Sequence, residues 1–145
     1  MQIEVTRTAG LNAIVNALFF DPAVVATTAS ASYTGTDDST LGTWTGKYGA
    51  NGQLIANDLS KIPAYASFNP SGDSTCTWTT STTDTRALQS ASGSSSRIAS
   101  TYFATNNDTF ALDVNLTDGN THKISLYMCD WDNQGRARQL PSAMR

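Results

Sequence analysis

Apolar and polar side chains alternate along residues 110–116 and again along residues 124–128, on either side of an Asp-Gly pair at 118–119. A repeat of two residues is typical of a β-strand with one buried face. The two stretches therefore predict a β-hairpin. We expect a loop of about three or five residues centred on the glycine, because an odd loop places Val114 opposite Ile124 and keeps the apolar side chains on one face.

A second hairpin is predicted at the start of the chain. Ile3 and Val5 alternate with polar neighbours, and residues 9–12 have the composition of a turn. The apolar run at residues 14–20 then predicts a strand that is buried on both faces.

Further short strands are predicted at residues 43–48, 63–68, 75–80 and 98–103, each bounded by Gly, Pro, Asp or Ser. Only residues 84–90 have a helix-like start, and they allow at most one short helical turn. A total of about seven to nine short strands with turns between them predicts an all-β fold, an antiparallel β-sandwich that is jelly-roll-like.

The length of 145 residues fits a single domain covering residues 1–145. Within it, residues 1–22 are expected to form a closing hairpin and residues 42–139 the main body. The stretch 23–41 is rich in Ala, Thr, Ser and Gly, which predicts a linker or a long loop. Residues 140–145 are expected to form a tail.

Charged residues make up 14% of the chain, the net charge is -3 and the isoelectric point is near 4.8. Because no stripe of Lys and Arg is present to neutralise phosphates, no nucleic-acid partner is expected. The most hydrophobic stretch, residues 13–20, is too short to span a bilayer, so no membrane partner is expected either. About a quarter of the residues are Ser or Thr, which is typical of secreted β-rich proteins and favours an extracellular or cell-surface location, although residues 1–4 carry no signal-peptide pattern.

Residues that could carry covalent chemistry are few. Cys76 and Cys129 allow one disulfide at most and belong to no zinc or redox motif; free buried thiols are favoured over a bridge, and both remain open. The single histidine, His122, lies beside the turn at 118–119 and is expected to be exposed. Because the acidic residues fall mainly in predicted turns, with no facing acid and base, we expect a protein that is not an enzyme.

The densest group of polar residues is Asp130-Trp131-Asp132-Asn133-Gln134-Gly135. The carboxylates of Asp130 and Asp132, together with nearby amide oxygens, could ligate Ca²⁺, which is the one cofactor that the sequence suggests. The closing acidic ligand of a calcium loop is missing. We therefore favour the alternative, a capped turn whose carboxylates accept backbone hydrogen bonds and pair with Arg136 or Arg138.

Aromatic rings complement the apolar faces of sugars, and polar side chains can bind their hydroxyl groups. Trp78 alternates with threonines like an inward strand residue and is expected in the core. Trp44 and Trp131 lie beside turns among polar residues, so partial exposure is expected for both. A polysaccharide-binding surface site is thus predicted, formed by Trp44, Trp131, Asp130, Asp132 and Arg136.

Several short strings together carry a resemblance to a known kind of domain: GTWTGKYGANG at 42–52, PAYA at 63–66, RALQ at 86–89, RIA at 97–99, NLTDG at 115–119 and LYMCDWD at 126–132. With them the chain resembles an uncharacterised accessory domain of large secreted bacterial proteins, which is similar to galactose-binding-like jelly rolls and carbohydrate-binding modules. The resemblance implies a non-catalytic extracellular carbohydrate-binding module. The alternative is a structural or self-assembling module of a surface protein, without a small-molecule ligand.

The order of segments departs from that domain. A segment like residues 3–20 normally follows the DWD string, whereas here it comes first, which implies a circularly permuted chain or one cut from a tandem array. We expect this segment to fold back within the chain beside the strand that ends at Cys129, rather than to complete another subunit. The strands that would follow Gln139 are missing, and the sheet edge left exposed favours a homo-oligomer.

Overall fold

Eleven β-strands and no helix are present in the residues that the computed structural model describes, which are 1–23, 31–93, 95–104 and 109–140. The strands are β1 (Gln2–Ala9), β2 (Ile14–Val15), β3 (Ala17–Pro22), β4 (Gly52–Ile55), β5 (Ala66–Ser71), β6 (Asp73–Thr79), β7 (Leu88–Gln89), β8 (Arg97–Ala104), β9 (Thr109–Leu116), β10 (His122–Tyr127) and β11 (Ala137–Gln139). All pairings between these strands are antiparallel. The predicted all-β class is confirmed.

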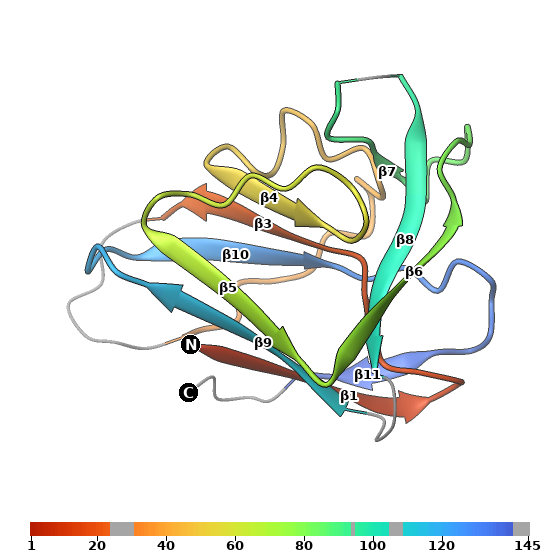
Figure 1. The fold of residues 1–145 in the computed structure, drawn as a ribbon, viewed down its shortest axis with the longest axis horizontal. Coiled ribbons are helices and arrows are strands. Elements are labelled where there is room, and N and C mark those ends of the chain that lie inside the picture. The colour runs from red at the N-terminus through yellow and green to blue at the C-terminus, as the bar shows by residue number, and fades with distance from the viewer. Residues whose placement is uncertain (24–30, 94, 105–108, 141–145) are drawn as a thin grey trace.

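The strands form three sheets (Figure 1). The lower sheet has the order β11-β1-β9-β5, the upper sheet has the order β10-β3-β4, and the side sheet has the order β2-β8-β6, with β7 also paired to β8. The upper and lower sheets enclose the larger hydrophobic core in a sandwich-like arrangement, and the side sheet closes one end of it.

The lower sheet and the side sheet meet at a corner. β5 and β6 are one extended segment that bends at Gly72, whose φ of 74° lies in the left-handed region that glycine adopts readily. Ser71 before the bend pairs with Ala111 of β9, and Asp73 after it pairs with Ala104 of β8. The chain therefore passes from one sheet to the next without a loop.

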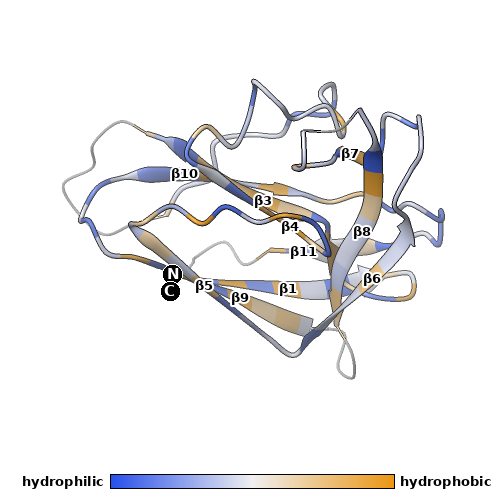
Figure 2. Cartoon of the chain, turned by 45° about the horizontal axis from the view of Figure 1, so that its top comes forward, coloured by the Kyte–Doolittle hydropathy of each residue, from blue (hydrophilic) through white to orange (hydrophobic). Residues whose placement is uncertain are grey.

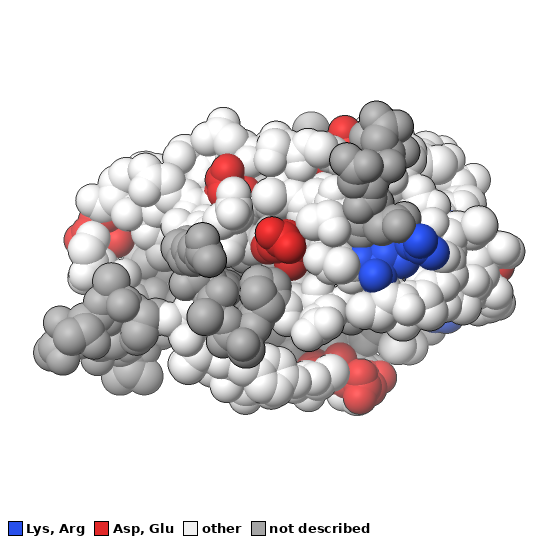
Figure 3. Space-filling view, turned by 90° about the horizontal axis from the view of Figure 1, so that it is seen from below, with Lys and Arg blue, Asp and Glu red and all other residues white. Residues whose placement is uncertain are grey.

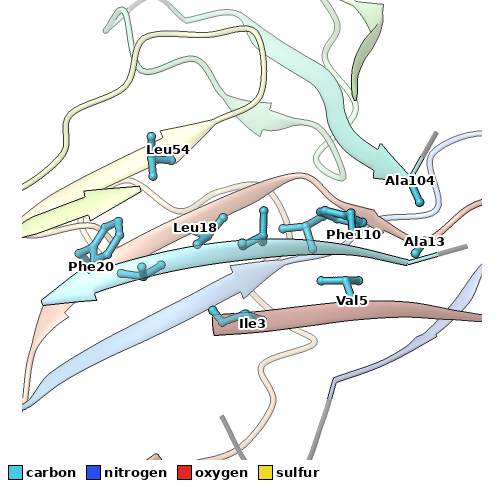
Figure 4. Packing of buried hydrophobic residues seen from close by; sticks show 11 residues of the cluster. Ile3, Val5, Ala13, Leu18, Phe20, Leu54, Ala104 and Phe110 are labelled. Atoms are coloured by element: carbon cyan, nitrogen blue, oxygen red, sulfur yellow. The ribbon is translucent and has the colours of Figure 1, made fainter. Parts of the chain in front are cut away.

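The buried side chains form two clusters. The larger one lies between the upper and lower sheets, and Figure 4 shows its members pointing toward one another. β3 contributes Leu18 and Phe20 to this cluster and Ala17 and Phe19 to the smaller one. Figure 2 shows hydrophobic residues along β3 and the strands around it. The prediction that this strand is buried on both faces is confirmed.

The hairpin predicted for residues 110–128 is wrong in its pairing. Both strands exist, but β9 lies between β1 and β5, whereas β10 pairs with β3. Leu112 and Val114 of β9 and Leu126 of β10 pack in the same core cluster. An alternating pattern suits two strands that face each other across a core as well as two strands that lie side by side, and this chain adopts the first arrangement.

The hairpin predicted at the start of the chain is wrong for the same reason. β1 lies in the lower sheet and β3 in the upper sheet, and the strand predicted at residues 14–20 is divided at Asn16 into β2 and β3. β3 pairs with β10 of the same chain, from Ala17 opposite Tyr127 to Pro22 opposite His122. This is the intramolecular arrangement expected for the segment.

Shorter elements were harder to predict. The predicted strands at 63–68, 75–80 and 98–103 correspond to β5, β6 and β8, with shifted ends. β4, β7 and β11 were not predicted, since strands of two to four residues are too short for a period of two to be seen.

Two predicted elements are absent. Residues 43–48 form a loop whose one bridge joins Thr45 and Tyr48, so the strand predicted there is wrong. Residues 84–90 contain no helix; the Asp84 carboxylate instead accepts a hydrogen bond of 2.9 Å from the backbone N–H two residues later and closes a turn before β7.

The predicted linker at 23–41 is described in part, because residues 24–30 lie outside the described residues, as do residues 141–145 of the predicted tail. Residues 31–41 contain no strand. Asp37 attaches this part of the chain to the loop that follows: it accepts hydrogen bonds from the hydroxyl of Tyr48 and from the backbone N–H groups of residues 39 and 40.

Asn16 occupies the point where the chain leaves the side sheet and enters the upper sheet, and only 3% of its surface is exposed. Its Nδ2 donates to the carbonyl oxygen of Ser100 at 2.6 Å, and its Oδ1 accepts from the backbone N–H of Cys129 at 2.6 Å. Its backbone N–H donates to Tyr127, and its carbonyl accepts from Ala56. One residue therefore connects β8, β10 and the segment after each of β4 and β10.

Replacing Asn16 by Ala is expected to lower the free energy of unfolding by about 2–6 kcal/mol, because the part-buried N–H of Cys129 and the buried C=O of Ser100 each lose a partner at ~1–3 kcal/mol. Urea unfolding followed by tryptophan fluorescence measures the change. Asn115→Ala, at an exposed position of β9, is the matched control and should change the value by less than about 0.5 kcal/mol. A loss for Asn16→Ala as small as that of the control would show that this junction does not hold the sheets together.

Candidate ligand-binding site

An open hollow of about 160 Å³ lies on the side sheet. Thr101 and Phe103 of β8 line it, and they alternate along the strand with Ser100 and Tyr102, which point toward the interior. The hollow therefore belongs to the face of the side sheet that is turned away from the core. Its other lining residues come from β2, β6 and two loops: Ile14, Cys76, Trp78, Asn12 and Arg136.

Trp78 forms an aromatic wall of the hollow. It is half-buried and lies at a β-bulge, where the register of β6 against β8 shifts between Thr77 and Thr79. The prediction that Trp78 lies in the core is wrong. Alternation along the strand places Trp78 and Thr77 on opposite faces, but it does not say which face is the interior. On the face opposite to the hollow, the hydroxyl of Thr77 accepts a hydrogen bond from Asn57.

Arg136 closes one side of the hollow. Its guanidinium lies 5.8 Å from the centre of the Trp78 ring, and its side chain is 7% exposed. Nη1 donates to Asp130 at 2.6 Å and also to Asp132, and Nη2 donates to Asp132 at 3.2 Å. A side chain at Gly10 would lie 2.6 Å from the Cα atom of Arg136, so the close approach of the two loops requires glycine there.

Asp130 caps the loop that carries Arg136. Its carboxylate accepts hydrogen bonds from the backbone N–H groups of Gln134 at 3.3 Å, Gly135 at 2.9 Å and Arg136 at 3.2 Å. Together with the ion pairs to Arg136, these bonds confirm the interpretation of this segment as a capped turn. The structure brings three of the predicted site residues together: Asp130, Asp132 and Arg136.

Both carboxylates of this loop carry a lowered pKa. Burial of Asp130 disfavours its ionised form, but hydrogen bonds from the side chain and backbone of Arg136 and from the backbone of Gln134 outweigh the burial and lower the pKa. The pKa of Asp132 is lowered by the hydrogen bond from Arg136, against a smaller opposing effect of burial. Both are ionised at neutral pH, so the loop carries two negative charges against the single positive charge of Arg136.

A calcium ion would have to compete with Arg136 for these carboxylates. Asp130 and Asp132 are the metal ligands suggested by the sequence, and the guanidinium pairs with both of them. Within the described part of the chain, no group of three or more His, Cys, Asp or Glu side chains is placed to hold a metal ion.

The other two predicted aromatic site residues lie elsewhere. Trp44 is 8% exposed, its ring centre is 5.0 Å from that of Phe19, and its Nε1 donates to the carbonyl of Gln89 at 2.8 Å. The expectation of partial exposure is wrong for Trp44, because the outer face of β3 is itself apolar and the loop folds over it. Trp131 is half-buried, as expected, but it lies outside the hollow, with the guanidinium of Arg86 at 5.0 Å from its ring centre.

His122 is less exposed than the sequence suggested. Its side chain is 7% exposed, its ring stacks on Tyr65 with centres 3.9 Å apart, and its Nε2 lies 3.0 Å from Asp118. The pKa of Asp118 is lowered to about 2 by hydrogen bonds from Asn120 and His122. The loop between β9 and β10 is thus held in place by this pair and does not contribute to the hollow.

No disulfide joins Cys76 to Cys129. Cys129 is half-buried, in partial agreement with the expected burial, whereas Cys76 is exposed. Burial was expected from the strand position alone, and the face on which Cys76 lies is the outer one. Its thiol belongs to the wall of the hollow.

No protein-family model, curated protein or solved structure matches this chain. The resemblance to secreted accessory domains therefore rests on the sequence strings between residues 42 and 132. The part of the chain that the structure describes holds no helix of the length and apolar character needed to cross a membrane.

Replacing Asp130 by Ala is expected to lower the free energy of unfolding by about 1–3 kcal/mol, because backbone N–H groups of the loop lose their acceptor. Asp132→Ala removes a carboxylate that pairs with the same guanidinium at the surface, and is expected to cost about 0–1 kcal/mol. Urea denaturation of both variants measures the difference. Equal losses would mean that the ion pairs, and not the backbone caps, hold the loop.

Thermal unfolding of the wild-type protein in calcium and in a chelator tests the metal hypothesis directly. A bound ion raises the melting temperature by mass action. Since Arg136 already pairs with both carboxylates, we expect the same melting temperature in the two solutions. A higher value in calcium that disappears in Asp132→Ala would establish a calcium site.

Proposed function

We propose that this protein is a non-catalytic carbohydrate-binding domain and that a sugar ring lies in the hollow of the side sheet, against Trp78. One observation carries the proposal: the hollow combines the ring of a half-buried tryptophan with polar groups at its rim and a buried floor. Sugar rings have an apolar face of C–H groups and a ring of hydroxyl groups, so they fit such a combination. Small-molecule sites in general are concave and largely apolar, with a few polar groups that fix orientation.

The lining residues suit these two roles. Trp78 and Phe103 supply aromatic surface, and the buried Ile14 lies beneath them. At the rim, the amide oxygen of Asn12 can accept a hydrogen bond from a sugar hydroxyl, while its Nδ2 donates to the carbonyl of Ala104. Arg136 is held by Asp130 and Asp132 and forms a fixed polar wall. The volume of about 160 Å³ is smaller than the ~300–1,000 Å³ of sites for drug-sized ligands. We infer that the hollow binds one ring of a longer glycan.

The charges near the hollow favour an uncharged glycan. Arg136 lines the hollow with one positive charge, and it pairs with two ionised carboxylates, those of Asp130 and Asp132. The net charge of these three side chains is therefore negative. A uronate or sulfate would therefore meet a net negative loop. On the face shown in Figure 3, which is the molecule seen from below, acidic side chains are separated by uncharged ones and most of the basic side chains in view form one group.

The titratable groups near the hollow support binding without catalysis. Glycoside hydrolysis uses two carboxyl groups on either side of the scissile bond. Asp130 and Asp132 instead pair with one guanidinium, and His122 pairs with Asp118 in a different loop. An extracellular or cell-surface location and a polysaccharide partner belong to the same proposal, supported by a composition rich in Ser and Thr and poor in Lys.

Affinity electrophoresis against a set of neutral and acidic polysaccharides tests the proposal. Trp78→Ala is expected to weaken binding to a neutral polysaccharide about tenfold, because loss of an aromatic contact worth ~1.5 kcal/mol corresponds to that factor. Trp131→Ala is the matched control: it removes a half-buried tryptophan outside the hollow and should bind like the wild type.

Two results would count against this function. One is a wild-type protein that is retarded by none of the polysaccharides. The other is a folded Trp78→Ala variant, verified by its melting curve, that binds as tightly as Trp131→Ala.

A further inference from the structure

β6 leaves one edge of the side sheet without a strand. It pairs with β8 along one side, and none of the described strands lies on the other side. The edge is regular from Asp73 to Thr77, before the bulge at Trp78, and Thr75 and Cys76 at its middle are exposed. Such an edge presents backbone N–H and C=O groups that can pair with a further strand.

The other sheet edges among the described strands are protected by features that discourage pairing. β2 and β7 have only two residues each. Each remaining edge strand contains a proline or a basic residue, or is bridged by one: β5 contains Pro70, β10 contains Lys123, β11 contains Arg138, and β4 is bridged by Lys61. β6 is the one described edge that is long and contains no Lys, Arg or Pro.

We propose that two copies of this chain associate through β6, with their strands antiparallel about a two-fold axis at Thr75, the centre of the regular segment. This register places Thr75 opposite Thr75 of the second copy, Ser74 opposite Cys76, and Asp73 opposite Thr77. The carboxylate of Asp73 then faces a hydroxyl group and not a second carboxylate. Within the edge itself no like charges are therefore placed opposite each other, although each chain carries a net charge of -3.

The association joins two side sheets into one continuous sheet. A two-fold axis perpendicular to that sheet turns the outer faces of both copies in the same direction, so the two hollows open on one surface. The contacts are backbone hydrogen bonds of residues 73–77, and Trp78 lies beyond them. Pairing of the edges does not depend on a ligand in the hollow.

Sedimentation velocity of the full chain over a concentration series tests the association. We expect the wild type to show a reversible equilibrium between monomer and dimer. Thr75→Lys places two like-charged side chains directly opposite each other, with their Cβ atoms about 5 Å apart, and is expected to remain monomeric at every concentration. Ser67→Lys adds the same charge at an exposed position of the edge strand β5, and is expected to dimerise like the wild type.

Cys76 reports the register independently of any charged variant. In the proposed pair the two Cys76 residues are diagonal neighbours, about 7–8 Å apart, within reach of a short bismaleimide. Crosslinked dimer is expected from the wild type at concentrations where it sediments as a dimer, and none is expected from Cys76→Ser.

Three results would overturn the association: a wild type that stays monomeric at all concentrations, a Thr75→Lys variant that dimerises as Ser67→Lys does, or crosslinked dimer from Cys76→Ser. Thr75 does not line the hollow. A Thr75→Lys monomer that still binds polysaccharide would therefore support the dimer and the binding site separately. If one proposal fails, the other is still tested by its own variant: Thr75→Lys tests the dimer, and Trp78→Ala tests the binding site.

Discussion

The side chain of Asn16 is the constraint on which the arrangement of the three sheets depends. Before this residue the chain pairs with β8, and after it the chain pairs with β10. No single strand pairing can therefore satisfy the backbone N–H and C=O groups at the junction. The amide supplies what the ladders lack, since it binds Ser100 in the side sheet and the backbone N–H of Cys129 after β10. Because the residue is buried, water does not replace these bonds, and an apolar side chain would leave both groups without partners.

The same junction begins the loop that shapes the candidate site. From Cys129 the chain enters the turn capped by Asp130, which directs Arg136 over the outer face of the side sheet. Gly10, in the loop that leads to β2, lets the two loops pack closely. The core and the hollow are therefore not independent. Asn16, which joins the sheets, also holds the first residue of the loop that places Arg136 beside Trp78.

The proposed edge pairing and the proposed sugar site use different parts of one sheet. Edge pairing uses backbone groups in the plane of the sheet, whereas ligand binding uses side chains that point out of that plane. Hence a strand such as β6 can do both. The bulge at Trp78 separates the two uses, because it ends the regular edge at the residue whose ring lines the hollow.

A period of two residues was enough to predict β9 and β10, and a nearly continuous apolar run was enough to predict the two-sided burial of β3. Local spacing was enough to predict the capped turn from Asp130 to Arg136. These features depend on neighbours in the chain, whose side chains and backbone groups meet in almost any fold. The partners of each strand were decided by the tertiary structure. So was the fact that Trp78, and not Trp44, lies on the outer surface at the hollow. Alternation defines two faces of a strand but gives neither of them a partner. That choice depends on which distant apolar surfaces can be buried together, as when β9 and β10 pack across the core instead of side by side.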